Sequence, residues 1–301
     1  MSEAVWTSPL TAIPLRQGLS DYLELTKPRL SLLVLATTAV GFWLGVRRVE
    51  ELARVTPLLI GTAFVVGGAN ALNQWLERVP DGLMKRTQHR PLPAGRLAPE
   101  AAFRFGVALS AGGIACLALA VNERCAMLAA ASWASYVFLY TPMKRWTACC
   151  TLLGAVPGAL PPVIGWVGAR NAGGAQAWAL FAILFVWQLP HFLSLALLYR
   201  DDYERAGFRL LPLIESDGRI TARQIALYGL ALVPVSLVPT LLGVAGPTYF
   251  YGALALGVVF SVIALRTSWQ RSAKSARQLF HASILYLPAL LGLLAFDRAP
   301  F

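Results

Sequence analysis

Long apolar runs dominate this chain and decide what it can fold into. A helix needs about 20 apolar residues to cross a bilayer, and the sequence contains nine such runs, some short or interrupted by proline. Because 57% of the residues are hydrophobic and only 14% are charged, little remains for a water-soluble domain. We therefore predict an all-α, polytopic membrane protein with nine transmembrane helices. The predicted spans are 30–46, 56–75, 102–121, 124–141, 148–168, 176–199, 222–243, 247–267 and 279–296.

Lysine and arginine are distributed unevenly between the two ends of these spans. Most of the 26 cationic residues fall in the N-terminal segment 1–29 and in alternate loops, above all the long loops near 76–101 and 200–221. Cytoplasmic loops carry an excess of lysine and arginine. We therefore expect the N-terminal segment and both long loops to face the cytoplasm, with one transmembrane domain over residues 30–301. The N-terminal segment lacks a basic stretch followed by an unbroken apolar one, so no signal peptide is expected.

Charge and cysteine content narrow the possible functions. The net charge is +11, but the cations lie between apolar runs and form no single basic face. Membrane lipid and a phosphorylated substrate are therefore better partners than nucleic acid. The 4 cysteines lack CxxC spacing and indicate neither a disulfide framework nor a zinc site. No carboxylate falls in the middle of a predicted span, which argues against an ion-coupled transporter. A transporter or lipid-binding scaffold stays as an alternative that a divalent-metal requirement for activity would exclude.

The first long loop combines oxygen ligands with cations. Asn73, Glu77 and Asp81 are spaced i, i+4, i+8 and share one stripe if the helix continues, although Pro80 can turn Asp81 away. Carboxylates and cations would only neutralise each other unless a ligand lies between them. The loop therefore predicts a site for Mg²⁺ and diphosphate, because Mg²⁺ prefers carboxylate and phosphate oxygens and the cations bind the remaining phosphate charge. The candidate phosphate donors in this loop are Lys85, Arg86, Arg90 and Arg96, together with His89.

The second long loop repeats this mixture. The stretch "YRDDYERAGFRLLP" supplies Asp201 and Asp202 together with Arg200, Arg205 and Arg209. Two such loops on one face of the membrane can clamp one polyanion through shared metal ions. The alternative is that both loops are charged only because they are solvated and set the topology.

Sequence motifs beyond these loops resemble a known family. From "LTKPRLSLLVL" onward the chain is similar to the UbiA superfamily of intramembrane prenyltransferases, and within it to the branch that farnesylates haem. The motifs that carry the resemblance are "MKRTQHRPLPAGRL" (84–97), "YTPMKR" (140–145), "GALPPVIGW" (158–166), "WQLPHF" (187–192), "DDYERAGFRLLP" (201–212) and "SILYLP" (283–288). The chain departs from that branch at Val79, where a further Asp is common, and at Cys150, where Asn is expected.

The resemblance implies a reaction and a set of site residues. Farnesyl diphosphate, haem B and water would give haem O and diphosphate, in the cell (inner) membrane, with Mg²⁺ as cofactor. The implied catalytic residues are Asn73, Glu77, Asp81, Asp201, Asp202 and Tyr203, with Asn73, Glu77, Asp81 and Asp202 as metal ligands. The implied diphosphate contacts are Lys85, Arg86, Arg90, Lys144, Arg145 and Arg200. A hand-off of product to a haem A synthase or a terminal oxidase assembly factor is a further implied partnership. The alternative within the fold is a prenyltransferase for a quinone precursor or chlorophyllide.

Two aromatic residues of the "WQLPHF" motif are candidates for the haem side of the site. A buried imidazole in a haem-handling protein suggests that His191, beside Trp187, contacts the iron or a propionate. The simpler alternative is a histidine hydrogen-bonded to a neighbouring helix. His281, in another apolar run, has the same two explanations. Aromatic faces could shield a farnesyl cation, and the candidates are Trp75, Tyr140, Trp187 and Tyr203.

Overall fold

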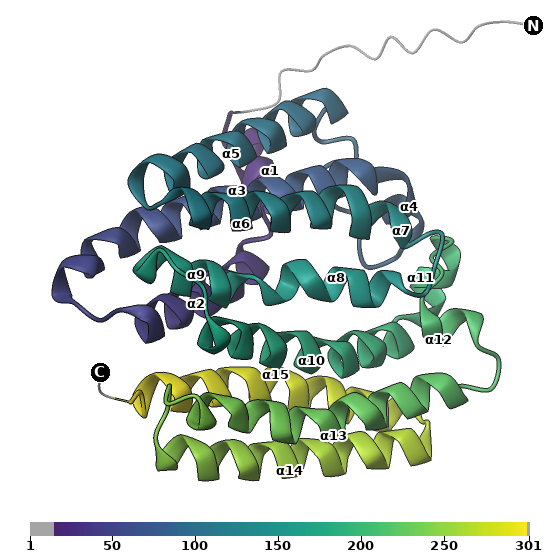
Figure 1. The fold of residues 1–301 in the computed structure, drawn as a ribbon. Coiled ribbons are helices and arrows are strands. Elements are labelled where there is room, and N and C mark those ends of the chain that lie inside the picture. The colour runs from purple at the N-terminus through teal and green to yellow at the C-terminus, as the bar shows by residue number, and fades with distance from the viewer. Residues whose placement is uncertain (1–14, 300–301) are drawn as a thin grey trace, which may run out of the picture.

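The protein is a bundle of helices. The structure, a computed structural model, describes residues 15–299 (Figure 1). No strand occurs within this range, where an isolated bridge joins Ala245 to Arg298. Residues 1–14 of the predicted N-terminal segment lie outside the described residues, and the rest of that segment forms α1 (Leu15–Leu25) and the turn after it.

Eight helical segments of the described chain are long and apolar enough to cross a membrane. Each overlaps one of the predicted spans, so the prediction of an all-α integral membrane protein is confirmed. They are α2 (Pro28–Gly45), α3 (Val55–Leu76), preceded by η1 (Val49–Arg54), α5 (Pro99–Ala120), the consecutive pair α8 (Cys150–Ala159) and α9 (Pro161–Arg170), α10 (Ala175–Leu198), α13 (Arg219–Leu241), α14 (Pro247–Gln270) and α15 (Ala273–Phe296).

The predicted span 124–141 is helical but not regular. α6 (Glu123–Ala134) continues into a π-helical segment, η2 (Ser135–Tyr140), and then into α7 (Thr141–Met143). The described residues thus hold eight candidate membrane spans and one mixed helix, where nine spans, some short or interrupted by proline, were predicted. A π-helical turn is wider than an α-helical one and is frequent at functional sites, and η2 borders the cavity described below.

The short helices gather at one end of the bundle. α4 (Arg78–Leu83), α7, α11 (Arg200–Arg205) and α12 (Leu211–Ile214) lie together there (Figure 1). α4 contacts α11, so the two long charged loops meet at the same end. This arrangement is what a shared site for one polyanion requires.

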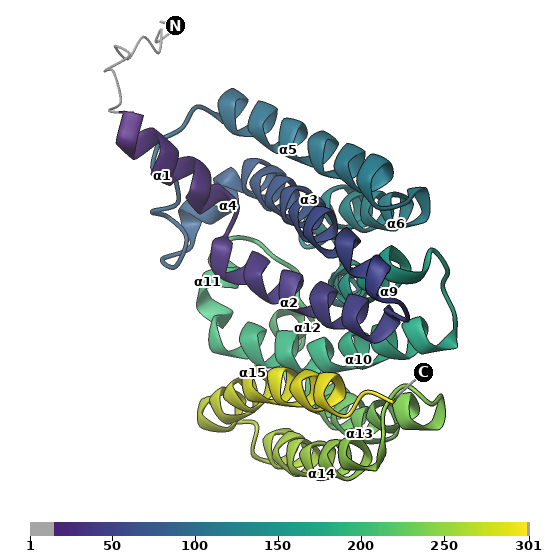
Figure 2. The same ribbon diagram turned by 90° about the vertical axis from the view of Figure 1, so that its left-hand side faces the viewer.

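Small residues let neighbouring helices approach closely. α2 packs on α9 (Figure 2), and a Cβ on Gly165 would lie 2.0 Å from the Thr38 carbonyl oxygen. A Cβ on Gly41 would likewise lie 2.0 Å from the Pro162 carbonyl oxygen. Because lipid provides no hydrophobic drive between helices, close packing of this kind is a main source of their association.

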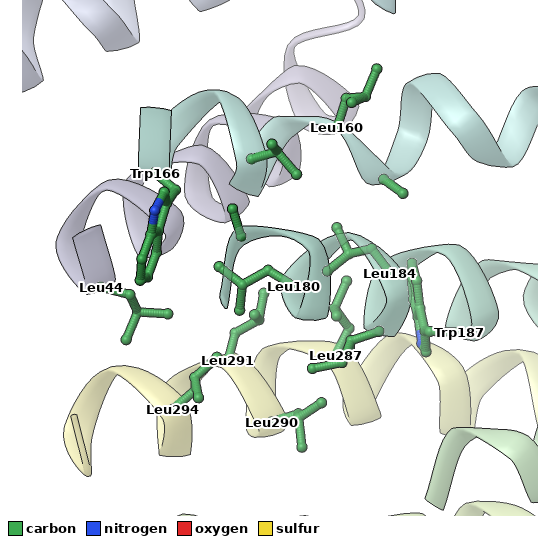
Figure 3. Close-up of a cluster of buried hydrophobic side chains, with 14 of the residues drawn as sticks. Leu44, Leu160, Trp166, Leu180, Leu184, Trp187, Leu287, Leu290, Leu291 and Leu294 are labelled. Carbon is green, nitrogen blue, oxygen red and sulfur yellow. The ribbon is translucent and has the colours of Figure 1, made fainter. Parts of the chain in front are cut away.

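A buried apolar cluster joins the middle of the bundle to its C-terminal part. α13, α14 and α15 pack together on one side of α10 (Figures 1 and 2). Leu180 and Leu184 of α10 face Leu287 and Leu291 of α15, with Trp166 of α9 beside them (Figure 3). This cluster fixes α10 against α15, the two helices that carry the "WQLPHF" and "SILYLP" motifs.

Candidate active site

A cavity of about 400 Å³ collects most of the predicted site residues. Its apolar walls come from α2, α3, α6, α8 and α10, and Tyr136 and Tyr140 of η2 line it as well. Asn70 and Gln188 line it from within α3 and α10, whereas its charged residues and Asn73 come from the helix ends and loops at the end of the bundle where the short helices lie. These polar lining residues are Lys27, Asn73, Glu77, Asp81, Arg86, Arg90 and Lys144.

The turn between α1 and α2 supplies Lys27, which the sequence analysis missed. Lys27 has a left-handed backbone, φ 49°, which costs a non-glycine residue about 1–2 kcal/mol. Two amides of α3 hold this turn: Asn70 Nδ2 donates to the Thr26 carbonyl at 3.1 Å, and Gln74 Nε2 donates to the Leu25 carbonyl at 2.9 Å. Burial, together with the nearby Arg90 guanidinium, lowers the pKa of Lys27 to about 7.

Asn73 is fixed from both sides of its amide. Its Oδ1 accepts from Lys27 Nζ at 2.9 Å, and its Nδ2 donates to Thr141 Oγ1 at 3.1 Å. Thr141 Oγ1 in turn donates to the Tyr136 carbonyl at 2.8 Å. The same carbonyl accepts the backbone N–H of Thr141, which closes the π-helical turn. The mixed helix therefore contributes directly to the orientation of Asn73.

The predicted stripe of oxygen ligands forms despite Pro80. The Glu77 N–H donates to the Asn73 carbonyl at 2.9 Å and the Asp81 N–H to the Glu77 carbonyl at 2.8 Å, so helical spacing persists across the junction of α3 and α4. All three side chains are nearly fully buried and line the same cavity. Val79, by contrast, is 67% exposed and outside the lining, so an Asp at that position would add no ligand to this cavity.

Each acid of this stripe is paired with a cation. Asp81 Oδ2 accepts from Arg90 at 2.7 Å, and Glu77 Oε1 accepts from Lys144 Nζ at 2.7 Å. Burial alone would lower the pKa of Lys144, but the adjacent Glu77 carboxylate raises it well above its ordinary value. The Lys144 ammonium also lies 4.5 Å from the centre of the Tyr140 ring. This ring packs directly on Gly154, where an added Cβ would lie 2.4 Å from a Tyr140 ring carbon.

The second charged loop packs against the first. Lys85 donates its backbone N–H to Asp202 Oδ1 at 3.2 Å, and Arg205 pairs with the same carboxylate. Tyr203 reaches the cavity, where its hydroxyl accepts from Arg86 at 3.4 Å. The two loops predicted to share a site are thus in direct contact.

Several predicted site residues lie outside the cavity lining. Asp201 and Arg145 are exposed, Arg200 pairs with Glu204 across the surface of α11, and Asp202 is buried between the loops. Lys85 contributes its backbone N–H to Asp202. The five predicted residues that do not line the cavity are Lys85, Arg145, Arg200, Asp201 and Asp202.

Two candidate phosphate contacts of the first loop also lie elsewhere. Arg96 pairs with Asp21 at 2.8 Å and with Glu24 at 2.5 Å, so it attaches α1 to the loop. His89 is exposed and outside the lining.

The oxygen ligands fit a hard divalent cation. Asp81 Oδ1 is buried and has no hydrogen-bond partner among the described residues, which is unfavourable for a carboxylate oxygen unless a cation binds it. Glu77 and Asn73 present further oxygens to the same cavity. Residues 15–299 contain no group of three or more His, Cys, Asp or Glu ligands. A site for Mg²⁺ typically combines a small number of protein oxygen ligands with phosphate oxygens of the substrate.

Aromatic side chains line the apolar part of the cavity. Of the predicted carbocation-shielding residues, Tyr140, Trp187 and Tyr203 lie in the lining, whereas Trp75 packs on Phe103 outside it. Trp133 of α6 and Tyr136 of η2 also line the cavity and were not predicted; the π-helical segment that carries Tyr136 has no recognised sequence signal. His191 lines the cavity, while His281 is exposed on α15.

Fold and site define a class of protein. A cavity with a charged end at the helix ends and aromatic and aliphatic walls within the bundle suits an amphiphile with an anionic head and an apolar tail. The chain belongs to the UbiA prenyltransferase family, which matches residues 34–287. The family resemblance inferred from the motifs is therefore confirmed.

Relatives and solved structures agree with this assignment. A protein of Solibacter usitatus named Protoheme IX farnesyltransferase is 48% identical, and the alignment covers 92% of this chain and 98% of that protein. A Myxococcus xanthus protein of the same name is 43% identical, and the alignment covers 93% of this chain and 95% of that protein. A digeranylgeranylglyceryl phosphate synthase structure superimposes with a TM-score of 0.79 at 15% identity, covering 93% and 98%. A UbiA homologue from Archaeoglobus fulgidus bound to GPP and Mg²⁺ superimposes with a TM-score of 0.64 at 18% identity, covering 91% and 99%.

Proposed function

We propose that this protein transfers the farnesyl group of farnesyl diphosphate to a vinyl group of haem B, with addition of water, giving haem O and diphosphate. The observation that carries the proposal is the 48% identity over nearly the full length to a protein named Protoheme IX farnesyltransferase. The cavity supports it, because its charged end suits the diphosphate and its apolar walls suit the fifteen-carbon chain.

The charged residues of the cavity bind and orient the diphosphate. Lys27, Arg86, Arg90 and Lys144 supply its donors, and arginine can bind phosphate oxygens in a bidentate manner. As the C1–O bond breaks, its electron pair leaves with diphosphate, and these fixed cations stabilise the growing negative charge. Mg²⁺, held by Asn73, Glu77 and Asp81, would add charge neutralisation on the same phosphate oxygens.

The apolar part of the cavity controls the allylic cation. Tyr136, Tyr140 and Trp133 line it, and ring faces attract a cation through their quadrupole. The haem vinyl group forms the new carbon–carbon bond with farnesyl C1. Water then adds to the resulting cation beside the porphyrin and loses a proton, leaving the hydroxyethylfarnesyl side chain.

We infer the orientation of the protein in the membrane, and its location, from the distribution of lysine and arginine. The excess of lysine and arginine at the end that holds both long loops supports a cytoplasmic N-terminal segment, 1–29, and a cytoplasmic entrance for diphosphate. The proposed location is the cell inner membrane, with the charged end of the cavity open to the cytoplasm. Because haem O keeps a reactive iron, transfer to a haem A synthase or a terminal oxidase assembly factor is a natural next step.

Product analysis tests the proposal. Membranes that contain the protein, supplied with haem B, farnesyl diphosphate and Mg²⁺, should yield a haem heavier by one hydroxyfarnesyl group in mass spectrometry. The reaction should stop on chelation of divalent metal and in the variant Asp81→Ala, with insertion of the variant checked by its amount in the membrane. The exposed Glu100→Ala variant is the control. Unchanged haem under conditions in which a known synthase works would reject the assignment.

The same experiment tests other acceptors. A quinone precursor or chlorophyllide, offered in place of haem B, should give no prenylated product. A prenylated quinone precursor together with unmodified haem would favour the alternative acceptor within the same fold.

A further inference from the structure

His191 of α10 is connected to Ser283 of α15 through one edge of its ring. His191 Nδ1 lies 2.7 Å from Ser283 Oγ, and Trp187 Nε1 donates to the Ser283 carbonyl at 2.9 Å. Ser283 is fully buried. The motifs "WQLPHF" and "SILYLP" are far apart in the sequence, but both contribute to the contacts around Ser283.

The hydrogen bonds of Ser283 determine the tautomer of His191. A serine hydroxyl has one proton, and Ser283 Oγ donates it to the Phe280 carbonyl at 2.6 Å. Ser283 Oγ must then accept the hydrogen bond from His191, so Nδ1 carries the proton. In a neutral imidazole with a proton on Nδ1, Nε2 has a free lone pair.

The opposite edge of the His191 ring is available to the cavity. His191 is partly exposed and lines the cavity, and among the described residues the one hydrogen bond of its ring is the Nδ1 contact with Ser283. Trp187 and Phe280 stack on the ring, with centroid distances of 5.2 Å and 5.0 Å and interplanar angles of 20° and 25°. The ring plane, its tautomer and its free lone pair are thus all set by surrounding residues.

We propose that Ser283 is a positioning residue that presents the His191 Nε2 lone pair to the iron of the haem substrate; this rests on the proposed function. Histidines that bind a metal ion commonly donate their other ring N–H to an oxygen acceptor, which fixes the tautomer and raises the basicity of the ligating nitrogen. A haem iron bound in this way is oriented by α10 and α15. One porphyrin edge would then extend toward the aromatic side chains that line the cavity.

Haem spectroscopy tests this inference independently of turnover. The purified protein in lipid nanodiscs is titrated with haem B, and absorption and electron paramagnetic resonance spectra report the axial ligand. We expect a histidine-ligated spectrum in the wild type, its loss in His191→Ala, and its recovery on addition of imidazole. His191→Cys should give a thiolate-type spectrum, an outcome possible only if residue 191 contacts the iron.

Variants of the serine separate positioning from general stability. Ser283→Ala should weaken haem binding about tenfold or more and change the ligand spectrum, and Ser283→Thr, which keeps the hydroxyl, should restore both. The matched control is Ser261→Ala, which removes another buried serine that donates to a helix carbonyl, Gly229 O, at 2.8 Å and does not line the cavity.

Each outcome bears on one of the two proposals. Wild-type affinity and spectrum in Ser283→Ala would overturn the role of Ser283, and a histidine-type spectrum retained in His191→Ala would place the ligand elsewhere. Either result leaves farnesyl transfer standing if haem O is still formed. Conversely, a wild type that shows histidine ligation but makes no farnesylated haem would refute the proposed function and leave the ligation intact.

Discussion

The ion pair between Glu77 and Lys144 allows a sharp test of how the site is built. Their charged atoms are 2.7 Å apart, and their side chains are 8% and 14% exposed. At an effective dielectric constant of about 20, two unit charges at that distance attract by about 6 kcal/mol, and desolvation of both groups offsets much of this. Removing one partner leaves the other charge buried and unpaired, so a single substitution should be more harmful than the net value of the pair.

We expect Glu77→Gln or Lys144→Met to lower the free energy of unfolding by about 3–5 kcal/mol each. The double variant should lose no more than either single variant, because no unpaired charge remains. The measurement is reversible unfolding in mixed detergent micelles, followed by circular dichroism. The matched control is the exposed pair of Glu100 and Arg104, 3.3 Å apart with both side chains largely exposed, where Glu100→Gln should change stability by less than about 1 kcal/mol.

The double variant shows whether Glu77 and Lys144 compensate each other's charge. If the two single losses simply add, the residues do not compensate each other and the description of a coupled buried pair is wrong. Single losses as small as that of Glu100→Gln would show that water or lipid headgroups solvate both charges. Turnover does not substitute for this measurement, since both residues line the proposed substrate cavity and every variant is expected to be inactive.

Three further perturbations follow from the site and the helix packing. Asp81→Asn should lower turnover by about 100-fold or more and raise the Mg²⁺ concentration needed; an unchanged metal dependence would remove Asp81 from the metal site. Lys27→Met should raise KM for farnesyl diphosphate about tenfold, the effect of one lost charged contact, with haem affinity as the internal control. Gly165→Ala should destabilise the bundle by about 1–3 kcal/mol, because its Cβ meets the Thr38 carbonyl, whereas Gly112→Ala, which meets nothing within 4 Å, should not.

Much of the architecture was predictable because a bilayer allows few alternatives. Apolar length and flanking charge placed the ends of the eight spans to within about three residues, except that α15 begins at Ala273 and its predicted span at 279. The spacing of Asn73, Glu77 and Asp81 placed three side chains on one face, and the helical hydrogen bonds across Pro80 preserve that face. These features depend on local geometry, which the sequence specifies directly.

The residues that were missed depend on tertiary contacts. Nothing in the sequence separates Lys27 from any other lysine beside a membrane span, and its role appears only when Asn70, Asn73 and Gln74 are seen to hold its turn. The adjacent acids Asp201 and Asp202 are a different case, since consecutive helical residues point about 100° apart. That geometry already implied that both could not face one cavity, and Asp202 is indeed buried while Asp201 is exposed.

The pairing of charges in the cavity has a consequence for substrate binding. Glu77, Asp81 and Asn73 each contact a different cation, so none of these cations can reach a phosphate oxygen at full strength without loosening its present contact. A diphosphate alone would leave two buried carboxylates uncompensated, and a divalent cation alone would compete with three bound cations. If both bound together, phosphate oxygens would replace the carboxylates around the lysines and arginine, and Glu77, Asp81 and Asn73 would be free to hold the metal. The arrangement therefore favours joint binding over either ligand separately, which means that each should raise the affinity for the other by the same factor.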